Sequence, residues 1–356
     1  INSPTIGVGE STSLMKSTSS SLSSGEWYFY PLDGYPILQG MALSGGYYLI
    51  ENARDLAFFP ELIEFNTLSY NEANFKLTND IDMSILAPGI YRTPSVTFSG
   101  EFLGTNDSAQ DQSDHYYIYN LNQTEYLAIN SKIYAGLFSV LGSGSLVKDL
   151  NLTQSSISID QTGVFYSYDV FVGGIAGEMI AGRIENVYVD VDIDLGEDAI
   201  GSIRLGGVVG QASGVIERVT NNGTINVNNH TYTTSTVPVD GRHYIGGIVG
   251  RTAVAKLQLI EVANRGDIFS YDTDSSITLA SGTQFYIYTG GVIGLVNHST
   301  FIKHELSDVT NSGDLTIYPM SQPTNGTGRQ YLGGVVGLIS GSAPVLEQDN
   351  QIKFAS

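Results

Sequence analysis

Three aspartates that alternate with apolar residues are the most concentrated set of groups in this sequence that could do chemistry. Asp190, Asp192 and Asp194 share one face of an expected strand, and Glu197 and Asp198 follow closely. Hard oxygen ligands at this density could hold Ca²⁺. The run lacks the glycine that follows the third aspartate of an EF-hand loop, which favours an exposed strand face. We therefore regard Asp190, Asp192 and Asp194 as calcium candidates only, and we expect no other cofactor.

A second pattern resembles a zinc-protease signature but falls short of it. Residues 304–308 read His-Glu-Leu-Ser-Asp, with aspartate where H-E-x-x-H has its second histidine, and no further ligand pattern follows. We interpret them as surface polar residues beside a repeat. The remaining histidines show no ligand spacing and lie in polar contexts, so we expect them to be solvated: His115, His230, His243 and His298.

Other enzyme chemistry finds little support in the residues. The chain has no cysteine, which excludes thiol catalysis, Cys-ligated zinc and iron–sulfur clusters. A G-x-S-x-G elbow is absent, and Gly-x-Gly runs such as 142–144 lack the lysine of a phosphate loop. Carboxylates are numerous enough for glycoside hydrolysis, but the sequence alone does not pair them. We therefore predict no catalytic residues.

Composition points to an acidic β-protein. The 356 residues include 36 Asp and Glu against 16 Lys and Arg, a net charge of −20, which argues against nucleic acid and anionic membranes as partners. Charged residues make up only 15% of the chain, while Gly reaches 41 residues and Tyr 22. Few exposed helices and many strands and turns are expected from this balance. No apolar run is long enough to span a bilayer, so we expect no membrane insertion.

The strongest signal is internal repetition. A five-residue pattern, Gly-Gly-[Ile/Val]-x-Gly, occurs five times, and a weaker first copy at 135–139 ends in serine. The five copies occupy residues 173–177, 206–210, 246–250, 290–294 and 333–337. A second element, Asn-x-Gly followed by Thr or Asp, begins at Asn221, Asn264 and Asn311.

Each repeat is expected to form one coil. The flanking glycines allow close backbone approach, and the Asn-x-Gly turn is expected to use positive φ to redirect the chain. One unit cannot bury its apolar face alone, whereas stacked copies can. Unequal repeat intervals predict variable loops, such as 226–243 and 269–287, on a constant coil. A Gly-rich sandwich or a propeller explains five near-identical copies less well.

The whole chain divides into four parts. Residues 1–26 are rich in Ser and Thr and are expected to form a linker or extended arm; 27–46 form an aromatic connecting segment. Residues 47–132 are expected to lead into and cap the solenoid, and 133–356 to form its coils. The best helix candidate lies within 48–65, where Leu56, Phe59, Leu62 and Ile63 follow a polar cap. Little other helix is expected.

These repeats resemble the GLUG motif of bacterial surface proteins, which include large adhesins and non-catalytic regions of IgA-protease-type metallopeptidases. The lead-in is similar too: 75–84 reads Phe-Lys-Leu-Thr-Asn-Asp-Ile-Asp-Met-Ser, and 98–104 reads Phe-Ser-Gly-Glu-Phe-Leu-Gly. Tyr48–Leu56, Tyr117–Leu121 and Ala135–Leu152 match further elements in order, so the resemblance covers roughly residues 47–337. It implies a right-handed parallel β-helix with extracellular placement and a structural or adhesive role.

Some departures from the family pattern bear on the shape of the coils, and others bear on the extent of the chain. Ser139 replaces the final glycine of the first repeat, and several loops exceed the compact form. Trp27–Leu38 resembles the passage that closes a preceding array, whereas none closes this one. We expect the chain to be one segment of a longer tandem protein.

Together these features predict an all-β, right-handed parallel β-helix (β-solenoid) with variable loops and little helix. We expect a non-enzymatic, extracellular or cell-surface module with a protein or glycan surface partner, or self-assembly through terminal strands. Two alternatives stay open: a polysaccharide-binding or polysaccharide-cleaving β-helix, and the non-catalytic arm of a surface protease. The tyrosines of 116–119, 166–168 and 285–288 either recognise ligands or stack between coils, and strand preference favours stacking.

Overall fold

The computed structural model describes most of the chain from residue 41 onward. The described residues are 27–29, 36–38, 41–64, 70–87, 89–105, 115–124, 127–159, 169–196, 202–228, 241–271, 284–298, 302, 304–318, 327–341 and 354–355. The predicted linker 1–26 therefore lies outside the described residues. The proposed division of the chain into parts stays a prediction.

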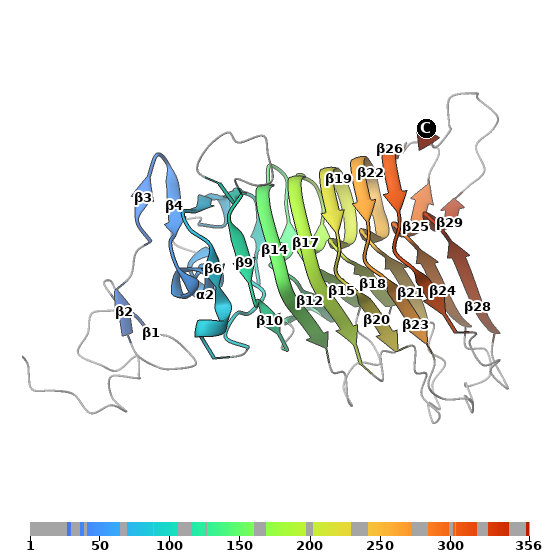
Figure 1. The fold of residues 1–356 in the computed structure, drawn as a ribbon, viewed down its shortest axis with the longest axis horizontal. Coiled ribbons are helices and arrows are strands. Elements are labelled where there is room, and N and C mark those ends of the chain that lie inside the picture. Colours follow the sequence, from blue (N-terminus) through green and yellow to red (C-terminus); the bar gives the residue numbers. More distant parts are fainter. Residues whose placement is uncertain are drawn as a thin grey trace, which may run out of the picture.

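The described residues are mostly β-strand in long parallel sheets (Figure 1). Seven strands form one sheet: β11 (Leu127–Ile129), β12 (Lys132–Ala135), β15 (Asp169–Gly173), β18 (Ser202–Gly206), β21 (Gly241–Gly246), β24 (Gln284–Gly290) and β28 (Thr327–Gly333). All its pairings are parallel except that of β11 with β12. A separate antiparallel pair joins β1 (Trp27–Phe29) to β2 (Pro36–Leu38) within the aromatic connecting segment.

The larger sheet winds through the rest of the described chain. Its early strands are β3 (Leu43–Ser44), β4 (Tyr47–Ile50), β5 (Asn74–Leu77), β6 (Ile81–Asp82), β7 (Thr97–Phe98), β8 (Glu101–Leu103), β9 (Tyr117–Tyr119) and β10 (Asn122–Gln123). Its later strands are β13 (Phe138–Leu141), β14 (Leu146–Ile159), β16 (Ala176–Met179), β17 (Arg183–Leu195), β19 (Val209–Asn221), β20 (Ile225–Asn228), β22 (Val249–Asn264), β23 (Ile268–Tyr271), β25 (Ile293–His298), β26 (Glu305–Asn311), β27 (Leu315–Ile317), β29 (Val336–Gly341) and β30 (Phe354–Ala355).

The glycine repeats lie directly on one another, as predicted. In the seven-stranded sheet Gly173 pairs with Gly206, and the register continues through Gly246, Gly290 and Gly333. After each pair the chain turns into a strand of the larger sheet, and backbone N–H groups of one corner donate to carbonyls of the next, as in Val292 N to Val335 O at 2.9 Å. This stacking is consistent with a β-helix-like fold.

Close backbone approach explains the first glycine of each pair. A Cβ at Gly246 would lie 2.1 Å from Val249 O, and one at Gly290 would lie 2.0 Å from Ile293 O. No side chain fits at such distances, so the corner requires glycine on steric grounds, without any need for positive φ.

The expected positive φ of the Asn-x-Gly turns is wrong, because neither residue type adopts it there. Asn264 instead points inward: its Nδ2 donates to Asn311 Oδ1 and to Gly266 O, both at 2.8 Å, and its Oδ1 accepts from Asn221 Nδ2 at 2.8 Å. The three asparagines thus form a hydrogen-bonded ladder across coils (the Asn ladder). Glycine is required at position 266, because the Cβ of any other residue there would lie 1.9 Å from Gly223 O.

Positive φ occurs in a different column. Five residues have φ between 51° and 56°: Asp149, Asn186, Arg218, Glu261 and Asp308. They lie on β14, β17, β19, β22 and β26, and each occupies the same place between two paired residues of its strand. Each long strand bends at this column, so the bend repeats in register from coil to coil. The sequence does not predict this column, because only one of its five residues is asparagine.

The expected helix is confirmed as α2 (Ala53–Glu64). Asn52 caps it by accepting from Arg54 N at 3.0 Å, and Leu56, Phe59 and Ile63 are buried. Short 3-10 turns η1 (Tyr70–Glu72) and η2 (Met83–Ile85) follow.

Among the described residues, no helix has the length and apolar character that crossing a membrane requires.

Candidate functional site

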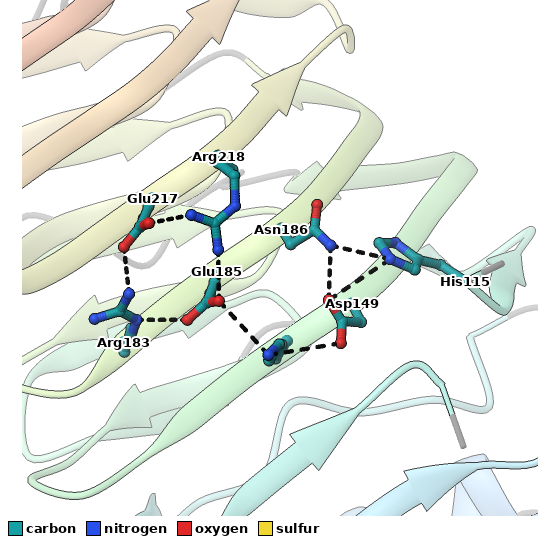
Figure 2. Close-up of polar contacts among 8 residues, drawn as sticks. His115, Asp149, Arg183, Glu185, Asn186, Glu217 and Arg218 are labelled. Atoms are coloured by element: carbon teal, nitrogen blue, oxygen red, sulfur yellow. Dashed lines mark hydrogen bonds and ion pairs between the residues drawn. The ribbon is translucent and has the colours of Figure 1, made fainter. Parts of the chain in front are cut away.

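A network of charged side chains spans three coils on the outer face of the larger sheet (Figure 2). Glu185 on β17 is paired in register with Lys148 on β14 and Glu217 on β19. It accepts from Arg183 Nε at 2.6 Å and Arg218 Nη2 at 2.5 Å, and Lys148 Nζ lies 3.6 Å away. Both arginines also contact Glu217.

The network neutralises its own charge. Burial raises the pKa of Glu185, but the hydrogen bond from Arg183 and the charges of Lys148, Arg183 and Arg218 outweigh burial and leave this pKa below its ordinary value. An ionised carboxylate enclosed by three cations is a poor proton donor or acceptor near neutral pH. The cluster therefore links coils rather than offering acid–base chemistry.

A buried His–Asp contact continues the network. Asn186 Nδ2 donates to Asp149 Oδ1 at 2.7 Å and lies 3.0 Å from His115 Nε2, while His115 Nε2 and Asp149 Oδ1 are 3.6 Å apart (Figure 2). The side chain of His115 is fully buried and that of Asp149 is 4% exposed. A catalytic pair must reach its substrate, which these side chains cannot do as placed.

The expectation of solvated histidines is wrong for His115 and His243, because both are buried. His115 packs against Asn186 and Asp149, and His243 lies in register between the buried Ile203 and Ile287. His304 is also buried rather than a surface residue: Leu257 N donates to its Nδ1 at 3.1 Å, and its Nε2 lies 3.0 Å from Asn297 O. Backbone groups thus occupy both ring nitrogens. His230 and the side chain of His298 lie outside the described residues.

The calcium candidates lie on β17 with the predicted alternation. Asp192 and Asp194 are exposed and Asp190 is half-buried, between buried apolar neighbours. Asp192 Oδ1 accepts from Thr224 N at 2.8 Å, which ties this carboxylate to the next coil. Glu197 and Asp198 lie outside the described residues. Within the described part of the chain, no three His, Asp or Glu side chains are placed to hold a metal ion, and calcium stays a prediction.

A pocket of about 160 Å³ lies beside η2. Much of its lining is apolar and comes from Met83, Leu86, Ile90 and Leu121. Tyr91 also lines the pocket, and its hydroxyl donates a hydrogen bond to Leu137 O at 2.6 Å. Its lining holds no acid, base or cation, so it offers apolar contact and the hydrogen-bonding groups of Ser84, Asn120 and Asn122, but no acid–base chemistry.

Basic and aromatic side chains gather instead on the outer face of the seven-stranded sheet. The strands β21, β24 and β28 carry alternating outward residues that align from coil to coil. We call the following six residues the Arg-Tyr strip: Arg242, Tyr244, Tyr286, Tyr288, Arg329 and Tyr331. The sequence signal, Arg-x-Tyr or Tyr-x-Tyr shortly before a glycine repeat, is visible in retrospect but needs the register to become a surface.

The rings of this strip stack between coils. Tyr288 lies 5.2 Å from Tyr244 and 5.1 Å from Tyr331 between ring centroids, each pair within 8° of parallel. The column continues in the preceding coils, where the Arg204 guanidinium lies 4.5 Å from the centre of the Phe171 ring. Within 285–288, stacking between coils is therefore confirmed for Tyr288, whereas 166–168 lie outside the described residues.

Cations are held against these rings. Arg251, on β22, lies 5.0 Å from the centre of the Tyr244 ring. Burial lowers its pKa, with the neighbouring charges of Arg204 and Arg242 acting in the same direction. A side-chain hydrogen bond with Tyr331 raises the pKa of the exposed Arg329. The strip therefore keeps its positive charge at any physiological pH.

Comparisons with known proteins return a fold likeness only. No family model matches this chain, and no curated protein matches its sequence. Among solved structures, the chain is similar to a Bacteroides ovatus protein described as a "putative immunoglobulin A1 protease", with 17% sequence identity and a TM-score of 0.46. The match covers 85% of this chain and 86% of that chain. A match at this level assigns neither an activity nor a partner.

Proposed function

We propose that this protein is a non-enzymatic, extracellular module that acts as a rigid structural or adhesive element, built as a right-handed parallel β-helix. The observation that carries the proposal is the unbroken register of the glycine corners from Gly173 to Gly333. Coils held in such register by backbone hydrogen bonds and by the Asn ladder resist bending and form a rod.

The polar groups of the described coils support a structural role. The charge network of β14, β17 and β19 balances three cations against the carboxylates of Asp149, Glu185 and Glu217. The buried His115 and His304 bond within the protein. Each of these groups joins one coil to another or to its own backbone. None is placed as an acid–base pair open to a substrate.

Small-angle scattering of the full chain tests the rod. The expected result is an elongated particle with one constant cross-section along its length. A globular scattering profile would contradict the proposal. The Gly247→Ala variant serves as the control for coil stacking, because its added Cβ would clash with the next coil. The scattering of this variant should fit an elongated particle less well than that of the parent.

Activity assays test the non-enzymatic part. Incubation with a polysaccharide panel should release no reducing ends, and incubation with immunoglobulin A or casein should release no peptides. Reducing ends would favour the polysaccharide-cleaving alternative, and peptide release would favour a protease. Antibody labelling of intact source cells tests placement, since an extracellular module should be labelled without permeabilisation.

A further inference from the structure

We infer that the Arg-Tyr strip binds an anionic polysaccharide, an inference that rests on the proposed adhesive function and names its ligand class. The strip contains two arginines, four tyrosines and no carboxylate, and Arg251 adds a third cation beside it. The whole chain carries a net charge of −20 with only 16 basic residues. Cations gathered on one face of so acidic a protein define where an anion can approach.

The geometry of the rings decides which groups meet a ligand. Because Tyr288 is stacked between Tyr244 and Tyr331, its ring faces are covered. Side chains stand roughly perpendicular to a sheet, so the phenolic hydroxyl is the outer end of each tyrosine. Tyr244 is buried, whereas Tyr286, Tyr288 and Tyr331 are partly exposed. The accessible strip is therefore a row of hydroxyl groups flanked by guanidinium groups.

Such a row matches a polymer that carries many hydroxyl groups and a negative charge at intervals. Guanidinium groups bind carboxylate or sulfate in a bidentate manner, and phenolic hydroxyls exchange hydrogen bonds with sugar hydroxyls. Neighbouring strands lie about 4.8 Å apart, so the same contacts repeat along the coil axis and favour a chain over a single small ion. Arg242 and Arg329 are exposed, two coils apart, and mark the ends of the strip.

Nucleic acid fits this surface less well. Its dense phosphate charge would be repelled by the remaining acidic surface, whereas a polysaccharide with sparser charge meets less repulsion. An acidic peptide shares the charge but lacks the hydroxyl groups that the tyrosine row would bind. Polyglutamate is therefore the probe that separates the two classes.

The test measures binding of the full chain to immobilised polygalacturonate and κ-carrageenan, which carry carboxylate and sulfate respectively, with amylose as the neutral control. Binding to at least one anionic glycan is expected, weakening as salt rises. The double variant Arg242→Gln/Arg329→Gln should lose about tenfold in affinity, since each arginine supplies charge-assisted hydrogen bonds. Tyr286→Phe should weaken binding less, because it removes one hydroxyl only.

Arg54→Gln/Arg265→Gln is the matched control, because both arginines are exposed outside the strip and the double variant removes the same two positive charges. Its affinity should stay within about twofold of the parent, and thermal unfolding should show that every variant folds. Absence of binding to both anionic glycans, equal binding of polyglutamate or amylose, or an equal loss of affinity in Arg54→Gln/Arg265→Gln would overturn the inference. A rod-shaped particle that binds no glycan would contradict only the inference about the Arg-Tyr strip. A globular particle would contradict the proposed rigid module.

Discussion

At the scale of single residues, buried amides connect the coils. Asn221 and Asn264 are fully buried, and each ladder asparagine also donates to the carbonyl of the glycine two residues later. A buried amide left without partners is costly, so ladder members stabilise the stack as a set. The second glycine of each corner provides the space, since a Cβ at Gly207 would lie 2.4 Å from Asn221 Nδ2.

Replacing Asn264 with alanine should destabilise the protein by about 3 kcal/mol. The substitution removes three hydrogen bonds and leaves the amide of Asn221 without its partner across the coil. Urea unfolding of both proteins measures the change. Asn222→Ala is the control, because Asn222 is exposed beside the ladder, and it should cost less than about 0.5 kcal/mol. Equal effects of the two substitutions would contradict the ladder.

Glu64 offers a test of pH dependence. Burial raises its pKa, but hydrogen bonds from Arg92 and Ser95 and the charge of Arg92 outweigh burial and leave the pKa below its ordinary value. Arg92 donates to both carboxylate oxygens of Glu64, at 2.8 and 2.7 Å, which fixes α2 to the segment before β7. A carboxylate with a lowered folded-state pKa stabilises fully above its unfolded pKa, about 4.3, and loses this contribution as pH falls through the folded value.

The free energy of unfolding should therefore decrease below about pH 4, and Glu64→Gln should lower stability near neutral pH while reducing that decrease. Urea unfolding between pH 7 and pH 3 measures both effects. Glu72→Gln, at an exposed glutamate in η1, should leave the profile of the parent unchanged. A Glu64→Gln profile parallel to that of the parent would show that the ion pair does not carry the pH dependence.

At the scale of elements, the corner between a strand of the seven-stranded sheet and its successor is the repeating structural unit. Two features fix it: glycines where backbones approach within side-chain distance, and the positive-φ column where the long strands bend. Positive φ is strained for residues such as Glu261, and its recurrence in five coils shows that stacking outweighs that strain.

The motif glycines allow a matched comparison. Alanine at Gly247 would place its Cβ 2.2 Å from Asn264 Cγ and 2.3 Å from Gly291 O, so we expect a loss of at least about 2 kcal/mol. Alanine at Gly334, the equivalent position one repeat after Gly291, meets nothing within 4 Å and should change stability by less than about 0.5 kcal/mol. Thermal unfolding of both variants measures the difference, and similar costs would show that backbone flexibility, rather than space, selects glycine.

At the scale of the whole molecule, the two ends of the described stack differ. At the N-terminal end α2 covers the core, and Phe59 contacts the rings of Phe75, Phe98, Phe102 and Phe138 at 4.9–5.9 Å between centroids. In the last described coil, by contrast, Leu332 is 57% exposed and Ile339 is 47% exposed. Coils that contact one neighbour bury less apolar area than coils between two.

Hydrogen exchange followed by mass spectrometry should reflect this asymmetry. Amides of β17, β19 and β22 should exchange slowest, because each of these strands pairs on both sides, and amides of β28 and β29 should exchange fastest among the stacked strands. The strands β4 and β5, under α2, are the internal control and should stay protected. Uniform protection from β17 to β29 would show that the last coil is as stable as the middle ones.

Local sequence was sufficient to predict the glycine repeat, the predominance of β-strand and helix α2. The repeat is recognised from glycine pairs that follow a short run of apolar residues. Helix α2 is recognised from the spacing of apolar residues after a capping asparagine. Both patterns involve only residues that are close together in the chain. The alternation of Asp190, Asp192 and Asp194 was predictable for the same reason, because side chains alternate in any strand.

Contacts between coils were decided only by the tertiary structure. Repeat intervals vary, so residues come into register at different separations: Glu185 pairs with Glu217, 32 positions later, whereas Asn264 pairs with Asn311, 47 positions later. The Asn ladder, the positive-φ column, the buried histidines and the Arg-Tyr strip all depend on that register. Hydrogen bonding between parallel backbones and the space available only at glycine set it, and neither can be read from one repeat alone.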